Sequence, residues 1–206
     1  METVGQVIRQ RSERQLQQGI SRTSFSIPTE VTELAQAVCE KYGQEGAMIL
    51  SEYNADYIMR KKMDADACIF GKFPTLAELN KRFDNRFAAA WVMAHLHDLS
   101  EFCGCREKLN GQALKQCASI ISMEFYYLKI SELMLFFYRF KTGKYGRFYG
   151  SVDPLVITTA LREFLIDRAS AYARHEREEQ VRQRMEWEKE AVSYEEYLRQ
   201  KNGQNR

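Results

Sequence analysis

The 206-residue chain is poor in the residues that interrupt helices, with only three prolines and eleven glycines. Proline inside a helix removes a backbone donor and clashes with the preceding turn, so this scarcity allows long helices over most of the chain. Hydrophobic residues make up 45% and aromatic residues 12% of the sequence. That content is enough for a core and excludes wholesale disorder.

Cysteine is also scarce. Five cysteines are an odd number at low density, which excludes the framework of a small disulfide-stapled domain. The N-terminus has no apolar segment typical of a signal peptide, and the most apolar run, Leu133–Phe137, is five residues long. A membrane span needs about 20 apolar residues. We therefore expect a cytoplasmic protein with free thiols and no membrane contact.

The chain has almost no excess of one sign of charge, because 30 basic and 28 acidic residues give a net charge of only +2. So small a net charge predicts no class of partner, and any electrostatic argument has to be local.

Helix signals recur along the chain. Thr75–Glu78 is a capping box, in which the Thr hydroxyl and the Glu carboxylate satisfy backbone donors reciprocally. It predicts one long helix running to about Phe102. Asp153 followed by Pro154 is a second start signal. Apolar residues at helical spacing also predict helices near 111–125 and 133–140.

These elements predict an all-α protein with three parts. Residues 1–25 have too few apolar side chains to bury and are expected to form a mobile arm. Residues 26–173 are expected to form a compact multi-helix body. Residues 174–206 form a charged helical tail, because the long C-terminal helix mixes acids and bases at spacings that favour i,i+4 pairs.

The most informative segment is 138–150, which holds four cations, five aromatic residues, three glycines and no anion. Cations attract phosphates, aromatic rings stack on unpaired bases, and glycine lets the backbone approach a ligand. The candidate nucleic-acid-binding residues are Arg139, Lys141, Lys144, Tyr145, Arg147, Phe148 and Tyr149. The alternative is a structural turn, in which the rings fold onto the core and the cations stay in water.

A metal site and a catalytic site are not expected. The candidate metal ligands are His95, His97, Cys103 and Cys105, which lie within eleven residues. Two residues apart on a helix, however, the two imidazoles diverge by about 200°. No Ser-His-Asp or Cys-His arrangement can be argued from three histidines. We therefore expect no metal, no cofactor and no enzymatic activity.

Trp187 stands on an otherwise charged stretch of the tail. A large aromatic side chain in such a place is a candidate anchor for a protein partner. A lone exposed tryptophan, or one packed back onto the body, explains it equally well.

The run from Ile121 to Asp153, and most specifically Tyr127–Asp153, resembles an uncharacterised helical protein family encoded in Bacteroidota genomes, phages and mobile elements. The resemblance covers about residues 75–175. It implies a mobile-element setting, in which small helical accessory proteins often serve DNA replication.

The leading hypothesis is therefore a non-enzymatic accessory protein of DNA metabolism, helicase-loader-like or replication-associated, that contacts single-stranded DNA through the 138–150 loop. A replication protein or another host protein is a further expected partner. The alternative is a protein–protein interaction module that acts through its helical tail without nucleic acid. The oligomeric state is not predicted.

Overall fold

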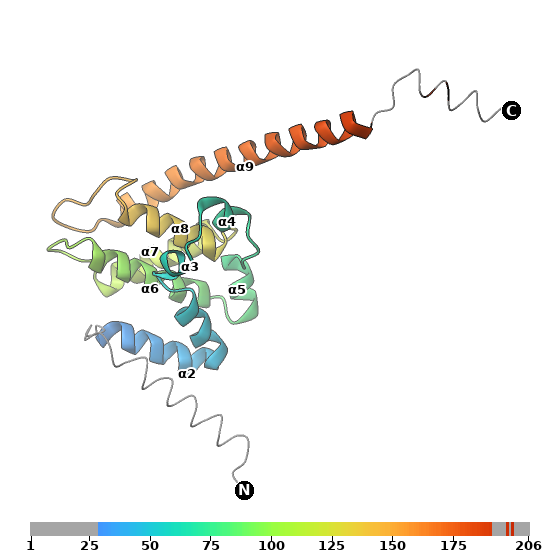
Figure 1. Cartoon of the computed structure of the whole chain (residues 1–206). Helices are drawn as coiled ribbons and strands as arrows, with labels where there is room; N and C mark the ends of the chain where they lie inside the picture. Colours follow the sequence, from blue (N-terminus) through green and yellow to red (C-terminus); the bar gives the residue numbers. More distant parts are fainter. Residues whose placement is uncertain (1–28, 191–196, 198, 200–206) are drawn as a thin grey trace, which may run out of the picture. The chain divides into compact units, whose positions relative to one another are not determined.

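The structure is a computed structural model that describes residues 29–190 together with residues 197 and 199. In these residues the chain forms eight α-helices and no strand, which confirms the predicted all-α class (Figure 1). The helices are α2 (Thr29–Glu52), α3 (Tyr57–Lys61), α4 (Ala65–Phe70), α5 (Leu76–Arg82), α6 (Phe87–Phe102), α7 (Gly111–Glu124), α8 (Ile130–Lys141) and α9 (Pro154–Glu190). The predicted arm 1–25 and most of the tail beyond 190 lie outside the described residues.

Contacts divide the chain into two compact units, Met1–Ala47 and Met48–Arg206. The described part of the first unit belongs to α2, which bends at Gly43, where φ is 70° and ψ is −169°. Glycine reaches this conformation without the steric cost that a Cβ would add. The remaining helices belong to the second unit, and the candidate sites all lie there.

The second unit is built around α6 and α8. Helix α8 is buried on most sides, as its continuous apolar run predicts. Its Phe136 packs edge-on against Phe164 of α9 at 5.9 Å between ring centroids. Trp91 of α6 is fully buried and donates its Nε1 proton to the backbone carbonyl of Tyr53 at 3.1 Å. Aromatic packing of this kind supplies much of the buried apolar area.

The predicted start of α5 is confirmed in atomic detail. The Thr75 hydroxyl accepts a hydrogen bond from the backbone N–H of Glu78, whose carboxylate accepts one from the N–H of Thr75. The same backbone region is held from outside, because the N–H of Leu76 donates to the carbonyl of Leu128 at 3.0 Å. The turn before α5 is thereby tied to the turn before α8.

The predicted single helix from Thr75 to Phe102 is wrong. The structure has two helices, α5 and α6, separated by residues 83–86. Asp84 accepts a hydrogen bond from the backbone N–H of Arg86 at 2.8 Å, and Asn80 accepts one from the N–H of Ala88 at 2.9 Å. Short polar side chains that bond to nearby backbone compete with the helical ladder, and here they end one helix and begin the next.

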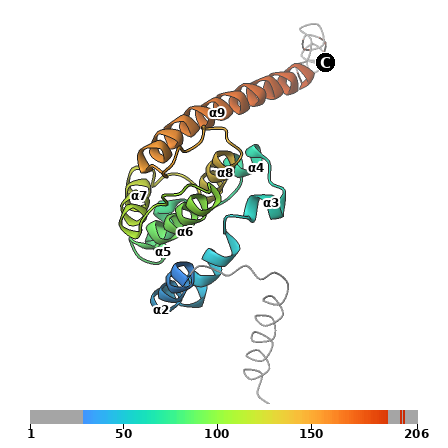
Figure 2. The ribbon, with the colours of Figure 1, turned by 90° about the vertical axis from the view of Figure 1, so that its left-hand side faces the viewer.

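The predicted long C-terminal helix is confirmed as α9, which begins at Pro154 after Asp153. The Asp153 carboxylate accepts a hydrogen bond from the N–H of Leu155 at 2.8 Å. Helix α9 packs on the body through a face that includes Ile157, Ala160, Leu161, Phe164 and Ala171. Figure 2 shows its N-terminal part beside α7 and α8.

Candidate nucleic-acid interface

The 138–150 segment begins in the last turn of α8 and leads back to α9. Gly146 and Gly150 have φ values of 86° and 78°. A residue with a Cβ pays roughly 1–2 kcal/mol for such left-handed backbone. At Gly150 the chain reverses sharply, because the N–H of Ser151 donates to the carbonyl of Tyr149 at 2.9 Å. The glycines therefore set the path of the loop.

Three of the four cations in this segment are paired with carboxylates from other helices. Lys141 forms an ion pair with Asp98 of α6, and its side chain is only 11% exposed. Arg139 and Lys144 both contact Oδ2 of Asp167 on α9, Arg139 at 3.5 Å. Because a carboxylate already neutralises them, these cations attract phosphate less than free cations would.

Two of the predicted stacking rings face the core. Tyr145 lies 5.5 Å from the ring of Phe136, and Phe148 stacks on Phe140 at 5.1 Å. Burial raises the pKa of Tyr145 to about 12. Both rings extend the aromatic core beneath the loop.

Arg147 and Tyr149 remain turned to solvent. Tyr149 is 86% exposed, the largest fraction for any large apolar side chain in the described residues. Arg147 is exposed as well, and the described part of the chain gives it no ion-pair partner. Of the seven residues predicted to contact nucleic acid, these two are available without breaking another contact.

A second loop, residues 103–110, lies alongside the first. The backbone N–H of Glu107 donates to the carbonyl of Gly150 at 3.2 Å, and the N–H of Val152 donates to the carbonyl of Glu107 at 2.9 Å. Figure 1 shows both loops at the same end of the helices. Arg106, directly before Glu107, is exposed and has no ion-pair partner in the described residues.

We call Arg106, Arg147 and Tyr149 the two-loop surface. It presents two unpaired cations and one exposed ring, with the Glu107 carboxylate as the neighbouring anion. Arg106 was missed in the sequence, because the hydrogen bonds that bring 107 beside 150–152 join segments more than 40 residues apart.

The candidate metal ligands do not gather. Among the residues that the structure describes, no group of three or more His, Cys, Asp or Glu side chains is placed to hold a metal ion. His95 is buried in the core, and its Nε2 lies 3.0 Å from the carbonyl of Tyr53. Cys103 and Cys105 are free thiols at the end of α6, and burial raises the pKa of Cys103 to about 11. A thiol with so high a pKa is a weak nucleophile at neutral pH.

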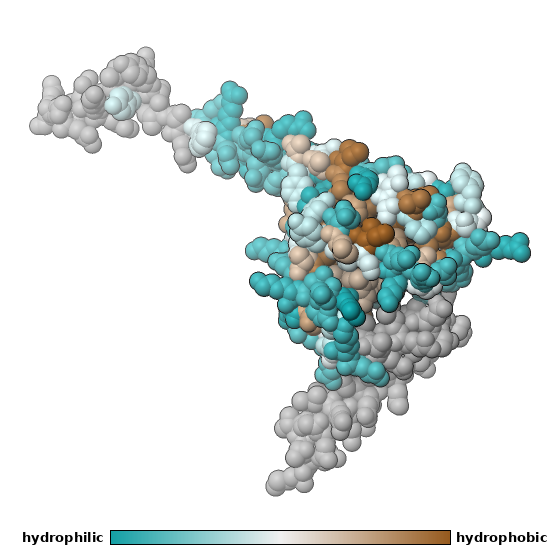
Figure 3. Space-filling view, turned by 180° about the vertical axis from the view of Figure 1, so that it is seen from behind, coloured by the Kyte–Doolittle hydropathy of each residue, from teal (hydrophilic) through white to brown (hydrophobic). Residues whose placement is uncertain are grey.

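Trp187 is 70% exposed on the outer part of α9. The outermost contact of α9 with the body in the described residues is the ring of His175 stacked on Phe70 of α4 at 4.3 Å. From Glu176 to Lys189 every described side chain is exposed. Figure 3 shows this part of the helix as mostly hydrophilic, with hydrophobic residues gathered on the body. Trp187 is therefore not packed back onto the rest of the second unit.

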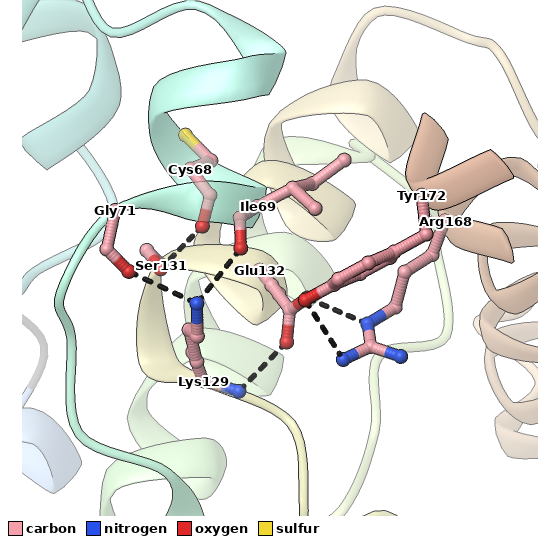
Figure 4. A network of polar contacts seen from close by, with 8 residues as sticks. All are labelled: Cys68, Ile69, Gly71, Lys129, Ser131, Glu132, Arg168 and Tyr172. Carbon is pink, nitrogen blue, oxygen red and sulfur yellow. Dashed lines mark hydrogen bonds and ion pairs between the residues drawn. The ribbon is translucent and has the colours of Figure 1, made fainter. Parts of the chain in front are cut away.

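A polar network that sequence reasoning missed ties α4, α8 and α9 together (Figure 4). Glu132 is completely buried, yet it carries a carboxylate. One oxygen accepts a hydrogen bond from the N–H of Lys129 at 2.9 Å, and the other contacts Nε of Arg168 at 2.6 Å. The Arg168 guanidinium also lies over the ring of Tyr172 at 4.8 Å.

The same network anchors α4. The Lys129 ammonium donates to the carbonyls of Ile69 and Gly71 at 2.8 and 3.0 Å, and the Ser131 hydroxyl donates to the carbonyl of Cys68 at 2.7 Å. These donors satisfy carbonyls at the end of α4 that have no partner within that helix. The one signal in the sequence is the acidic residue Glu132, which stands directly before the apolar run of α8.

Residues 108–206 match the model of a family of unknown function, DUF6633. This match covers α7, α8, α9 and the 138–150 loop, and it agrees with the resemblance to an uncharacterised family. No curated protein and no solved structure matches the chain.

None of the described helices is both long enough and apolar enough to cross a bilayer.

Proposed function

We propose that this protein is a non-enzymatic accessory factor of DNA metabolism that contacts single-stranded DNA through the two-loop surface. The observation that carries the proposal is the combination of an 86%-exposed Tyr149 with two unpaired arginines on adjoining loops. A ring with both faces free can stack on any base, and unpaired cations release counterions from phosphates.

The setting proposed for this activity follows from the family resemblance. A small helical factor of a phage or mobile element would act in the host cytoplasm, during replication, beside a helicase or another replication protein. The exposed loops supply the DNA contact in this proposal, and the helical body supplies the surface for the protein partner.

Fewer residues of the 138–150 loop are free to contact DNA than the sequence predicts. Lys141 and Arg139 are held by carboxylates, and Tyr145 and Phe148 by the core. We assign DNA contact to Arg106, Arg147 and Tyr149, and we expect Lys144 to add to it only when it leaves Asp167.

The test is fluorescence anisotropy of a labelled single-stranded oligonucleotide over a series of salt concentrations. Arg147→Ala and Arg106→Ala should each reduce the slope of log affinity against log salt by about 0.7. Tyr149→Ala should weaken binding by about 1–3 kcal/mol with little change in slope. Because these side chains are exposed, the melting temperatures of the three variants should match that of the wild type.

Two control variants sharpen the result. Lys61→Ala removes an exposed cation from α3, away from the two loops, and should leave affinity and slope unchanged. Lys141→Ala should also leave the slope unchanged, since this lysine is paired with Asp98. Wild-type protein that fails to bind at low salt and micromolar concentration would refute the proposal. So would a Lys61 variant that loses as much affinity as the Arg147 variant.

A second candidate function is partner binding through α9. The observation that favours it is the run of exposed side chains from Glu176 to Lys189, which includes Val181, Met185 and Trp187. A helix that leaves the body with apolar side chains exposed is suited to pairing with another helix. Affinity capture with wild-type and Trp187→Ala protein, after nuclease treatment, tests it; equal recovery of every partner would count against this function.

A further inference from the structure

Ten exposed residues form a continuous stripe along α9, opposite to its buried face. Their spacing alternates between four and three residues, as at the seam positions of a coiled coil, and half of them are apolar. The stripe consists of Leu155, Thr159, Arg162, Ile166, Ala169, Ala173, Glu176, Gln180, Gln183 and Trp187. Its three largest apolar members, Leu155, Ile166 and Trp187, are 73%, 69% and 70% exposed. In the unit Met48–Arg206, no described side chain buries them.

The stripe is symmetric about residue 171. Each position has a counterpart at equal distance on the other side, so that an antiparallel copy of the helix would match Leu155 with Trp187 and Ala169 with Ala173. Antiparallel pairs bring the two kinds of seam position together in each layer. The alanines at the centre would let the two backbones approach closely, as small residues do at helix crossings.

A groove beside one end of the stripe provides a place for the tryptophan. It has a volume of about 260 Å³ and lies between α7 and the start of α9. Ile120 of α7 lines one wall, and Leu155 and Arg162 of α9 line the other. Trp187 of a second copy, opposite Leu155, would lie at this groove. Ile120 and Leu155 supply apolar surface in this groove against which an aromatic anchor can pack.

Charge favours the same arrangement. In the antiparallel register Glu163 of each copy faces Arg177 of the other, so the dimer contains this pair twice. Neither residue has an ion-pair partner in the described part of the monomer. A parallel pair would instead set Arg162 against Arg162 and Glu176 against Glu176. Like charges at such positions disfavour the parallel pair relative to the antiparallel one.

We propose that two copies of this chain associate antiparallel through the α9 stripe, with Trp187 of each copy seated at the α7–α9 groove of the other. The inference rests on the second candidate function, partner binding by α9, and names the partner as a second copy. Because the interface is isologous, it closes at a dimer. Polar residues at Arg162, Glu176 and Gln180 weaken the pair, so we expect a reversible dimer that dissociates on dilution.

Sedimentation velocity of the nuclease-treated full chain over a concentration series tests the proposal. The wild type should shift from monomer to dimer. Ala169→Glu places a charge at the close centre of the pair and should abolish the dimer. Arg182→Glu introduces a carboxylate at an exposed position of α9 off the stripe and should not. Trp187→Ala should raise the dissociation constant about tenfold or more.

A charge exchange tests the register. Glu163→Arg should weaken the dimer about tenfold, and the double variant Glu163→Arg/Arg177→Glu should restore it. A wild type that stays monomeric throughout the micromolar range, or a double variant that fails to recover, overturns the proposal. A monomeric protein that still captures a different partner through Trp187 overturns it as well, while leaving the second candidate function standing.

Discussion

Stability between pH 7.5 and 5.0 should depend strongly on one buried histidine. His95 is fully buried, and burial lowers its pKa from 6.5 to about 4, with the nearby charge of Lys141 acting in the same direction. Its Nε2 must carry the proton, because it faces the carbonyl of Tyr53, which can only accept. Its Nδ1 has no hydrogen-bond partner among the described residues. Protonation would therefore bury a charge and an unsatisfied N–H together.

The direction of the pH effect on stability follows from the order of the pKa values of His95 in the folded and the unfolded chain. The folded-state pKa lies below the unfolded value, so the unfolded chain takes up a proton first as the pH falls. The contribution of neutral His95 to the free energy of unfolding is fully present above about pH 6.5 and is lost progressively down to about pH 4. A difference between 6.5 and about 4 corresponds to roughly 3 kcal/mol in full. Between pH 7.5 and 5.0 the loss from this group is about 2 kcal/mol.

Urea unfolding of the wild type and of His95→Gln at both pH values measures this loss. The glutamine amide can still donate to the Tyr53 carbonyl but takes up no proton in this range, so the variant should lose about 2 kcal/mol less than the wild type. Ile157→Val, at a fully buried position of α9, is the control for a general loss of core packing, because it changes no titratable group. It should keep the pH dependence of the wild type. Equal losses for the wild type and His95→Gln would refute the reasoning.

Three further predictions concern stability. Lys62 ends α3 at φ 51°, the one non-glycine residue with positive φ in the described chain, and Lys62→Gly should raise the free energy of unfolding by about 0.5–1 kcal/mol in urea titration. Arg168→Met should lower the free energy of unfolding by about 3 kcal/mol, because it leaves the Glu132 carboxylate buried without its cation. A double-mutant cycle with Glu132→Gln should be strongly non-additive, and additive losses would contradict a coupled pair. Ending the chain after Glu178 should leave the melting temperature within about 2 °C of the wild type, since the last packed contact of α9 is at His175; a broad, non-cooperative melt would show otherwise.

The sequence by itself determined the helical class, the starts of α5 and α9, and the approximate positions of α7 and α8. The reciprocal hydrogen bonds of Thr75 and Glu78 and the Asp153–Pro154 pair are local, so the residues that form them are neighbours in the chain as well as in space. The same holds for the buried apolar run of α8, whose composition leaves it no exposed side. Local chemistry of this kind can be read without knowing what packs against it.

The tertiary structure decided which charged and aromatic side chains are free to contact a ligand. Lys141 and Lys144 looked free in the sequence, but Asp98 and Asp167, 43 and 23 residues away, neutralise them. The break between α5 and α6 depends on Asn80 reaching forward eight residues to the N–H of Ala88. Periodicity shows that a helix has faces, but not which face the core will cover. The exposed stripe of α9 became visible only once the opposite face was seen packed against α8.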